Sequence, residues 1–255
     1  MLALAVIHVS VFSLFHPQAF TVQPAQGTAT VVQTAQRTET LEGAQSLILK
    51  GPSKVTGRAG APVNFILSIP NRIVREFHGT LDVRREGDHL LALVEMDVET
   101  AVASIVEGES PGASPEARKA QAVATRSYLL AAHGRHTGYD FCDTTHCQYL
   151  RGATTQGSIG RQAANSTSNL VITYQGHVVP ALYSADCGGH TKSLQEAGWA
   201  SAEYPFFGVA CPIKGEPQGH GIGMCQRGAI ELARQGKTFR EILSYYFPAT
   251  TLTNQ

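Results

Sequence analysis

Two alternating segments constrain the fold of this chain more than any other feature. HGTLDVRR at 78–85 and HLLALVEMDV at 89–98 each alternate apolar and polar residues, and a Gly-Asp turn separates them. Alternation with a period of two is typical of strands with one buried face, and a short turn containing glycine joins antiparallel neighbours. The sequence therefore predicts a β-hairpin here, and with it an antiparallel sheet.

Helical patterns follow this hairpin directly. A first helix is expected over 98–106, with Asp97 as its N-cap. A second is expected over 114–133, because Ser114 and Pro115 are typical of the N-cap and the first helical position, and Gly134 follows its end. Two well-delimited helices are thus predicted after the hairpin.

The C-terminal part adds both kinds of element. LVITYQGHVVPALYSA at 170–185 indicates two strands joined at 175–176, and Thr238 with Glu241 forms a capping box before a short helix. The predicted fold class is therefore α+β, with antiparallel strands packed with several helices in one main domain over 70–255.

The N-terminal part looks different. MLALAVIHVSVFSLFHPQAF at 1–20 is too short and too polar for a spanning helix, and we interpret it as an export signal, although the first basic residue is Arg37. A mis-assigned start or a buried N-terminal strand are the alternatives. Residues 21–69, rich in Thr, Gln, Gly and Ala, are expected to be a linker or a loosely ordered extension. The expected location is outside the cytoplasm, in the periplasm or cell wall or anchored to a membrane.

Charge excludes one class of partner. Lys plus Arg equals Asp plus Glu at 20 each, and the sequence pI is about 7.1. No basic excess exists to attract a polyanion, so we expect no nucleic-acid partner.

Glu109 is the candidate general acid. It lies in IVEGESP at 105–111, just before the second predicted helix, with few neighbouring charges to compete for its proton. Two other interpretations exist: Glu107 is an acid two residues away, and a Glu beside a helix start is often merely favourable to the helix dipole.

Four soft ligands lie within HTGYDFCDTTHCQYLRG at 136–152: His136, Cys142, His146 and Cys147. Thiolates and imidazoles at this spacing suit zinc. Adjacent side chains point to opposite faces of an extended chain, so His146 and Cys147 can share one ion only if the chain turns there. A disulfide between Cys142 and Cys147 is the alternative.

The remaining cysteines allow a different bond. In an exported protein Cys187 and Cys211 would pair, closing a loop that contains Trp199 and stabilising the fold by roughly 3 kcal/mol. Cys225 would then be left as a partly buried thiol. As a nucleophile it would need His220 beside it.

GHGIGMCQRGA at 219–229 is glycine-rich. Its alternate glycines let the backbone approach a ligand, to which His220 and Gln226 could hydrogen-bond. A phosphate loop would need a βαβ context that is missing here. The alternative is a tight turn into a helix over 226–235.

Five blocks in order resemble the stage II sporulation protein D family, also called SpoIID/LytB, whose members act on peptidoglycan. The resemblance runs from about residue 72 to 249 and is carried by EGESP with EARKAQAVATRSY, YDFCDTTHCQYLRG, YSADCGGHT, GHGIGMCQRGA and ILSYYFP. Two residues depart from the family pattern: Ser110 stands where many relatives carry Met, and Cys225 where they usually carry Ser.

This resemblance implies a lytic transglycosylase that cleaves glycan strands to anhydro-muramyl products, with Glu109 as its single catalytic residue. It implies structural zinc at Cys142 and His146, with His136 and Cys147 as further ligands. The substrate-binding residues it implies are Ser184, Gly188, Gly189, Thr191, His220 and Gln226.

The rivals are a non-catalytic glycan-binding enhancer of a cell-wall amidase and a hydrolase that uses the zinc directly. The first would still bind glycan after Glu109→Gln, and the second would be abolished by chelators.

Overall fold

The computed structural model describes residues 5–132, 135–200 and 204–255 and confirms the α+β class. The chain divides into two compact units, the first Met1–Ser104 with His133–Thr155 and the second Ile105–Ala132 with Gln156–Gln255. Each unit is described by itself.

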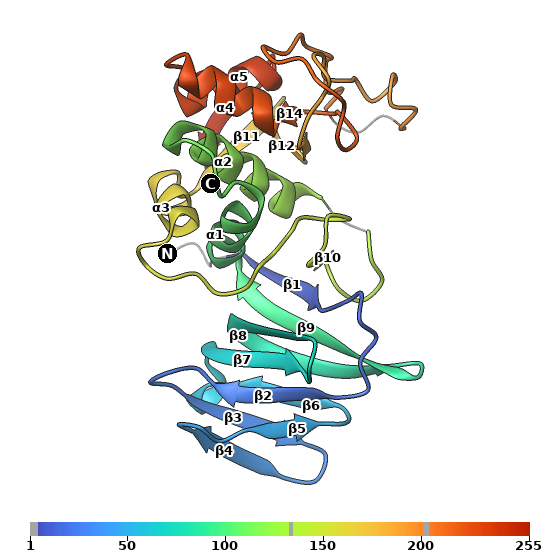
Figure 1. Cartoon of the computed structure of the whole chain (residues 1–255), viewed down its shortest axis with the longest axis vertical. Coiled ribbons are helices and arrows are strands. Elements are labelled where there is room, and N and C mark those ends of the chain that lie inside the picture. The colour runs from blue at the N-terminus through green and yellow to red at the C-terminus, as the bar shows by residue number, and fades with distance from the viewer. Residues whose placement is uncertain (1–4, 133–134, 201–203) are drawn as a thin grey trace. The chain divides into compact units, whose positions relative to one another are not determined.

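The first unit is built on a ten-stranded, mostly antiparallel sheet (Figure 1). Its main path runs β10-β1-β9-β8-β6-β3-β4, and β7, β2 and β5 continue from β8. The strands are β1 (Val6–Val11), β2 (Phe20–Pro24), β3 (Ala29–Thr34), β4 (Thr38–Glu42), β5 (Leu47–Leu49), β6 (Ser53–Thr56), β7 (Val63–Ile69), β8 (Ile73–Glu86), β9 (His89–Asp97) and β10 (Phe141–Cys142), with a 3-10 turn η1 (Arg58–Gly60).

The predicted hairpin is confirmed as β8 and β9, which pair up to Glu86 opposite His89. β8 changes partner midway, from β7 up to Gly79 to β9 from Thr80 onward. Gly79 has a φ of +149°, and a Cβ there would collide with the backbone oxygen of Glu95. Glycine is therefore required where the two strand pairings meet.

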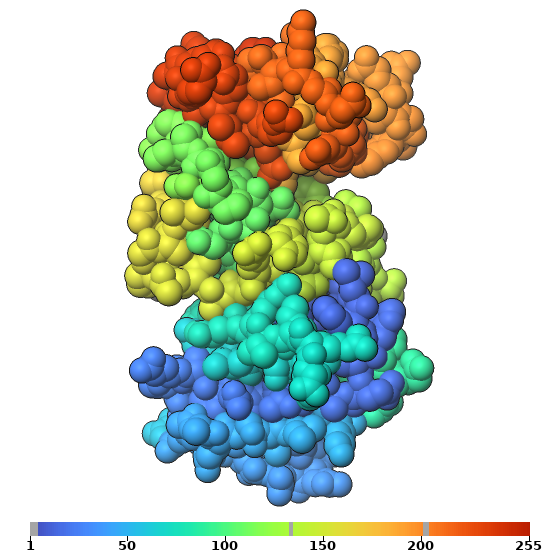
Figure 2. Space-filling model, viewed as in Figure 1, coloured from blue at the N-terminus to red at the C-terminus, as the bar shows by residue number. Residues whose placement is uncertain are grey.

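The N-terminal part differs from the expectation. β1 pairs with β9 along its length, and Val9 and Val11 are 1% exposed. For residues 6–11 the structure thus shows a buried strand, which was the alternative to the export signal expected over 1–20. Residues 1–4 lie outside the described residues. The linker expected over 21–69 is β2 to β7 instead, and Figure 2 shows these blue residues packed within their unit.

The second unit is organised around α2 (Pro115–Ala131), which packs against three helices and β11 (Figure 1). Ala117, Ala120 and Ala124 are at most 3% exposed, so neighbours approach α2 closely. The other elements are α3 (Ile159–Ser166), α4 (Gln226–Arg234), α5 (Phe239–Tyr246), β11 (Leu170–Tyr174), β12 (His177–Val178), β13 (Tyr183–Ser184), β14 (Met224–Cys225) and β15 (Thr251–Asn254). The unit boundary falls within α1 (Val98–Glu109).

The predicted helix starts are largely confirmed. Asp97 Oδ1 accepts a hydrogen bond from Thr100 N at 2.9 Å, and Thr238 with Glu241 forms the capping box. Ser114 occupies the N-cap of α2, but its side chain makes no capping hydrogen bond. The predicted helix stop at Gly134 lies outside the described residues.

Among the described residues, no helix combines the length and the hydrophobicity needed to cross a lipid bilayer.

Candidate active site and metal centres

Glu109 is the last residue of α1, three residues beyond the predicted end of that helix, and it is half-buried. A helix C-terminus carries partial negative charge, so a carboxylate is less favoured there than at a helix start. Glu116 occupies the first turn of α2 instead. Glu109 is therefore not placed to stabilise the dipole of the following helix.

Gln226 connects Glu109 to α2. Its Nε2 lies 3.4 Å from Glu109 Oε2, 3.4 Å from the Glu109 backbone oxygen and 3.3 Å from Gln121 Oε1. Gln121 is 1% exposed, and its own Nε2 donates to Thr125 Oγ1 at 3.2 Å. The Thr125 contact fixes the Gln121 amide so that its oxygen faces Gln226.

Tyr183 on β13 belongs to the same surroundings. Burial raises the pKa of the Tyr183 phenol well above 10.0, and the nearby charge of Glu109 raises it further. β13 pairs in parallel with β14, with Ser184 opposite Cys225, directly before Gln226. The sheet pairing thus brings a phenol that stays protonated to the region of the Glu109 carboxyl.

Glu107, the alternative acid, has a structural contact. Its Oε2 accepts a hydrogen bond from Gly160 N at 2.7 Å, in the first turn of α3. A carboxylate at a helix start satisfies an unpaired backbone donor and the dipole. Glu107 therefore stabilises α3.

The residues predicted to bind substrate fall into different environments. Ser184 is 6% exposed, and its Oγ has no hydrogen-bond partner among the described residues. Gly188 and Gly189 have positive φ angles of +74° and +111°. Thr191 is 1% exposed, and its Oγ1 accepts from Val209 N at 3.0 Å, which holds two loop segments together.

His220 lies beside a tryptophan. Its Nδ1 accepts from Ile222 N at 3.0 Å, and its ring centroid is 5.6 Å from that of Trp199. Trp199 and Phe207 are 46% and 42% exposed and line a pocket of about 760 Å³ together with His190, Ser193, Leu194, Gln195, Glu196, Pro205 and Gly208. Reasoning from the sequence missed this pocket, and the signal available there was two aromatic residues, Trp199 and Phe207, close together in the sequence.

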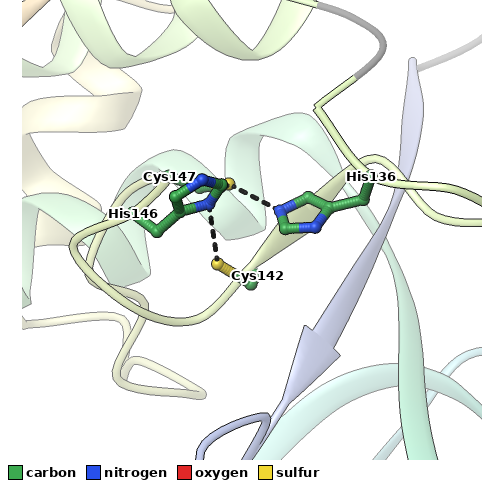
Figure 3. A group of neighbouring side chains, drawn as sticks. All are labelled: His136, Cys142, His146 and Cys147. Atoms are coloured by element: carbon green, nitrogen blue, oxygen red, sulfur yellow. Dashed lines mark hydrogen bonds between the residues drawn. The ribbon is translucent and has the colours of Figure 1, made fainter.

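The four predicted metal ligands of the first unit meet in one cluster (Figure 3). His136 Nε2 is 3.2 Å from Cys147 Sγ, and Cys142 Sγ is 3.8 Å from His146 Nδ1. The chain turns at 144–147, where Cys147 N donates to Thr144 O at 3.0 Å, so adjacent residues do share one site. All four donor atoms lie within 4.8 Å of one another and could hold a metal ion.

The disulfide considered between Cys142 and Cys147 is not formed, since both are free cysteines. The hydrogen bond from Cys147 lowers the pKa of Cys142 to about 3, and the same contact raises the pKa of Cys147. The pair therefore readily provides one thiolate. Two thiols and two imidazoles are a donor set that fits tetrahedral zinc.

Asp143 anchors this loop to β8 and to the residues that directly follow β1. Its carboxylate accepts from Phe12 N at 2.9 Å, Ser13 Oγ at 3.1 Å and Arg75 Nη1 at 2.9 Å. The side chain is 6% exposed, so these bonds satisfy a buried charge.

The disulfide expected between Cys187 and Cys211 is also absent, since both are free cysteines. Cys225, expected to be left over, is fully buried and joins them, with all three sulfur atoms within 4.8 Å of one another. This second group could also hold a metal ion.

Comparison with known proteins gives three similarities. Residues 86–174 match the SpoIID family model, described as stage II sporulation protein. The chain is 31% identical over 144 residues to an uncharacterized protein of Brachyspira hyodysenteriae, covering 55% of this chain and 37% of that protein. It is 34% identical over 101 residues to an amidase enhancer of Bacillus subtilis, covering 39% of this chain and 14% of that protein.

These alignments cover far less than two thirds of either relative. The family match extends from the β8/β9 turn through α1, α2 and the first metal cluster to β11. It therefore includes Glu109 and all four ligands of that cluster, and this part of the chain matches the SpoIID domain family.

Proposed function

We propose that this protein is a lytic transglycosylase that cleaves peptidoglycan glycan strands, with Glu109 as its catalytic acid and base. The observation that carries the proposal is the environment of Glu109: a half-buried carboxyl at a helix end, contacted by the Gln226 amide, near a protonated Tyr183. Partial burial and positioned donors suit a carboxyl that gives up and regains a proton.

In the proposed reaction, the Glu109 carboxyl protonates the glycosidic oxygen while the bond from that oxygen to the sugar C1 breaks. The resulting carboxylate then takes the proton of the same sugar's C6 hydroxyl, and the oxygen of that hydroxyl bonds to C1. The anhydro ring closes, no water is consumed, and the carboxyl is protonated again. One acid is enough, in contrast to the paired carboxyls of hydrolytic glycosidases.

The glycan would bind along the surface that carries Trp199 and Phe207. Both aromatic side chains are exposed, and polar groups such as His190 and Glu196 line the same pocket. Aromatic faces with a few polar groups are typical of ligand pockets. Ser184, Gly188, Gly189 and His220 are also proposed to contact the glycan, because they lie in sequence blocks that resemble the SpoIID/LytB family.

Zinc is the proposed ion of the cluster formed by His136, Cys142, His146 and Cys147. When bound, it would cross-link the loop 136–147 and supply no chemistry to the cleavage. Glu109, Gln226 and Tyr183 carry the proposed reaction.

The test compares wild type, Glu109→Gln and Glu107→Gln on peptide-stripped glycan strands, with products identified by mass spectrometry. Glu107→Gln is the matched control, because Glu107 lies in the same helix as Glu109 but its carboxylate accepts a hydrogen bond from Gly160 N of α3. We expect anhydro-muramyl products from wild type and Glu107→Gln and none from Glu109→Gln. Products from folded Glu109→Gln would refute the assignment.

The second candidate is a non-catalytic glycan-binding enhancer of a cell-wall amidase, favoured by the similarity to a protein named amidase enhancer. It predicts no cleavage by any variant, glycan binding that survives Glu109→Gln, and faster peptide release when an amidase is added. Either function requires a location outside the cytoplasm, which is also proposed.

A further inference from the structure

We infer that Cys187, Cys211 and Cys225 form a second metal centre, which binds a thiophilic ion such as zinc separately from the His136 cluster. The inference rests on the arrangement of the three sulfur atoms and their surroundings. It does not depend on the proposed glycan cleavage.

The distances suit one shared ion. All three sulfur atoms lie within 4.8 Å of one another. With zinc–sulfur bonds of about 2.3 Å, two thiolates on one tetrahedral ion are roughly 4 Å apart. Cys187 and Cys225 are 6% and 0% exposed, and Cys211 is half-buried. A small movement of the sulfur atoms would complete the site.

One of the sulfur atoms also accepts a backbone hydrogen bond. Gly228 N, in the first turn of α4, donates to Cys225 Sγ at 3.4 Å. A donor directed at sulfur helps to orient it as a ligand.

Tyr246 closes the site on one side. Its hydroxyl lies 3.2 Å from Cys211 Sγ, and Tyr246 is 0% exposed. A Cβ at Gly228 would collide with both Tyr246 Oη and Cys211 Sγ. The Tyr246 hydroxyl and the backbone at Gly228 thus pack directly against Cys211 Sγ.

The chain segment around these cysteines has little regular structure. Between β13 and β14, 185–223 has only isolated bridges among its described residues: Asp186 with Gln218, His190 with Ala210, and Lys192 with Ile222. Long segments without regular structure are uncommon in compact domains. The cysteines lie near its start, within it and just after its end, so one ion would join all three places, whereas a disulfide joins two.

The centre would hold α4 at the start of the proposed active site. Cys225 is the N-cap of α4 and directly precedes Gln226, the residue that contacts Glu109. Cys187 follows Asp186, which is fully buried and forms an ion pair with Arg227 of the same helix. The ion and the ion pair would fix the first turn of α4 together.

The test measures the zinc content of the purified full-length chain by inductively coupled plasma mass spectrometry, after expression in medium that contains zinc. We expect two zinc ions per wild-type chain, one in Cys225→Ser, one in Cys142→Ser and none in the double variant. Met224→Ala is the matched control: it truncates a side chain 1% exposed in the same strand but removes no ligand, and it should keep both ions.

Two results would overturn the inference. One is an equal zinc content in wild type and Cys225→Ser. The other is a disulfide within this trio, seen by intact mass without reductant, together with a single ion per chain. If Cys225→Ser does not fold, cobalt replaces zinc in Cys142→Ser, whose three distant thiols are intact. A thiolate-to-cobalt charge-transfer band supports the centre, and its absence contradicts it.

Discussion

Replacing Gln226 by alanine tests the active-site geometry in detail. Gln226 Nε2 lies 3.4 Å from Glu109 Oε2, near the outer limit of a hydrogen bond. In the resting protein the contact is therefore weak. It should shorten when Glu109 becomes a carboxylate in the reaction, because hydrogen bonds to charged groups are stronger and contribute about 1.5–3 kcal/mol.

Since the bond strengthens as the charge develops, its loss should appear in kcat more than in KM. Taking the lower half of that range, about 1.5–2 kcal/mol, Gln226→Ala should lower kcat roughly ten- to thirtyfold. The assay is the initial rate of anhydro-muramyl product release, read by liquid chromatography with mass spectrometry, beside thermal unfolding of each variant.

Gln235→Ala is the matched control, because Gln235 ends the same helix and is exposed, with its amide bonded to Glu231. It should leave kcat unchanged. Gln226→Glu should move the alkaline limb of the pH–rate profile to higher pH, because a second carboxylate beside Glu109 disfavours loss of the proton that Glu109 must donate. Equal kcat for Gln226→Ala and Gln235→Ala would refute the assigned contact, as would a kcat loss that merely follows a loss of folded protein.

Three further predictions follow from other parts of the structure. Cys142→Ser should release the ion of the first cluster and lower Tm in calorimetry, while cleavage at a temperature where the protein stays folded persists; abolished cleavage by folded protein would favour direct zinc chemistry instead. Trp199→Ala should weaken glycan-strand binding at least severalfold in a sedimentation assay with little change in Tm, because this side chain is 46% exposed, and unchanged binding would remove the pocket from the substrate surface. Burial alone would raise the pKa of Glu116, but hydrogen bonds from Lys119 and Phe239 N lower that pKa below 4.5. The Glu116 carboxylate therefore stabilises the fold above pH 4.5, and this contribution is lost as the pH falls through the pKa that Glu116 has in the folded protein. Glu116→Gln should lower Tm near neutral pH but not in acid, and an effect on Tm that is independent of pH would contradict this.

Local signals account for the features that the sequence predicted well. The β8/β9 hairpin depends on alternation and one turn, and the capping box of α5 on Thr238 and Glu241 alone. The His136 cluster is also local, since its ligands lie within one loop that turns at 144–147. Periodicity, caps and ligand spacing are readable wherever the partners are close in sequence.

The missed features depend on distant partners. β2 to β7 were expected to be a linker because Thr and Gln dominate their composition, yet Val22 and Val32 alternate with those polar residues and are 0% exposed. Gln121 looks like a surface residue of a helix until Gln226, 105 positions away, is brought beside it. The association of three thiols instead of two likewise depends on tertiary structure, which spacing does not reveal.

Digestion of peptide-stripped strands in water labelled with a heavy oxygen isotope tests most directly whether Glu109 cleaves glycan strands without water. We expect unlabelled anhydro-muramyl ends from wild type and from Glu107→Gln, and no products from Glu109→Gln. Labelled reducing ends would show hydrolysis and contradict the proposed chemistry, and unlabelled anhydro products from folded Glu109→Gln would contradict the role of Glu109.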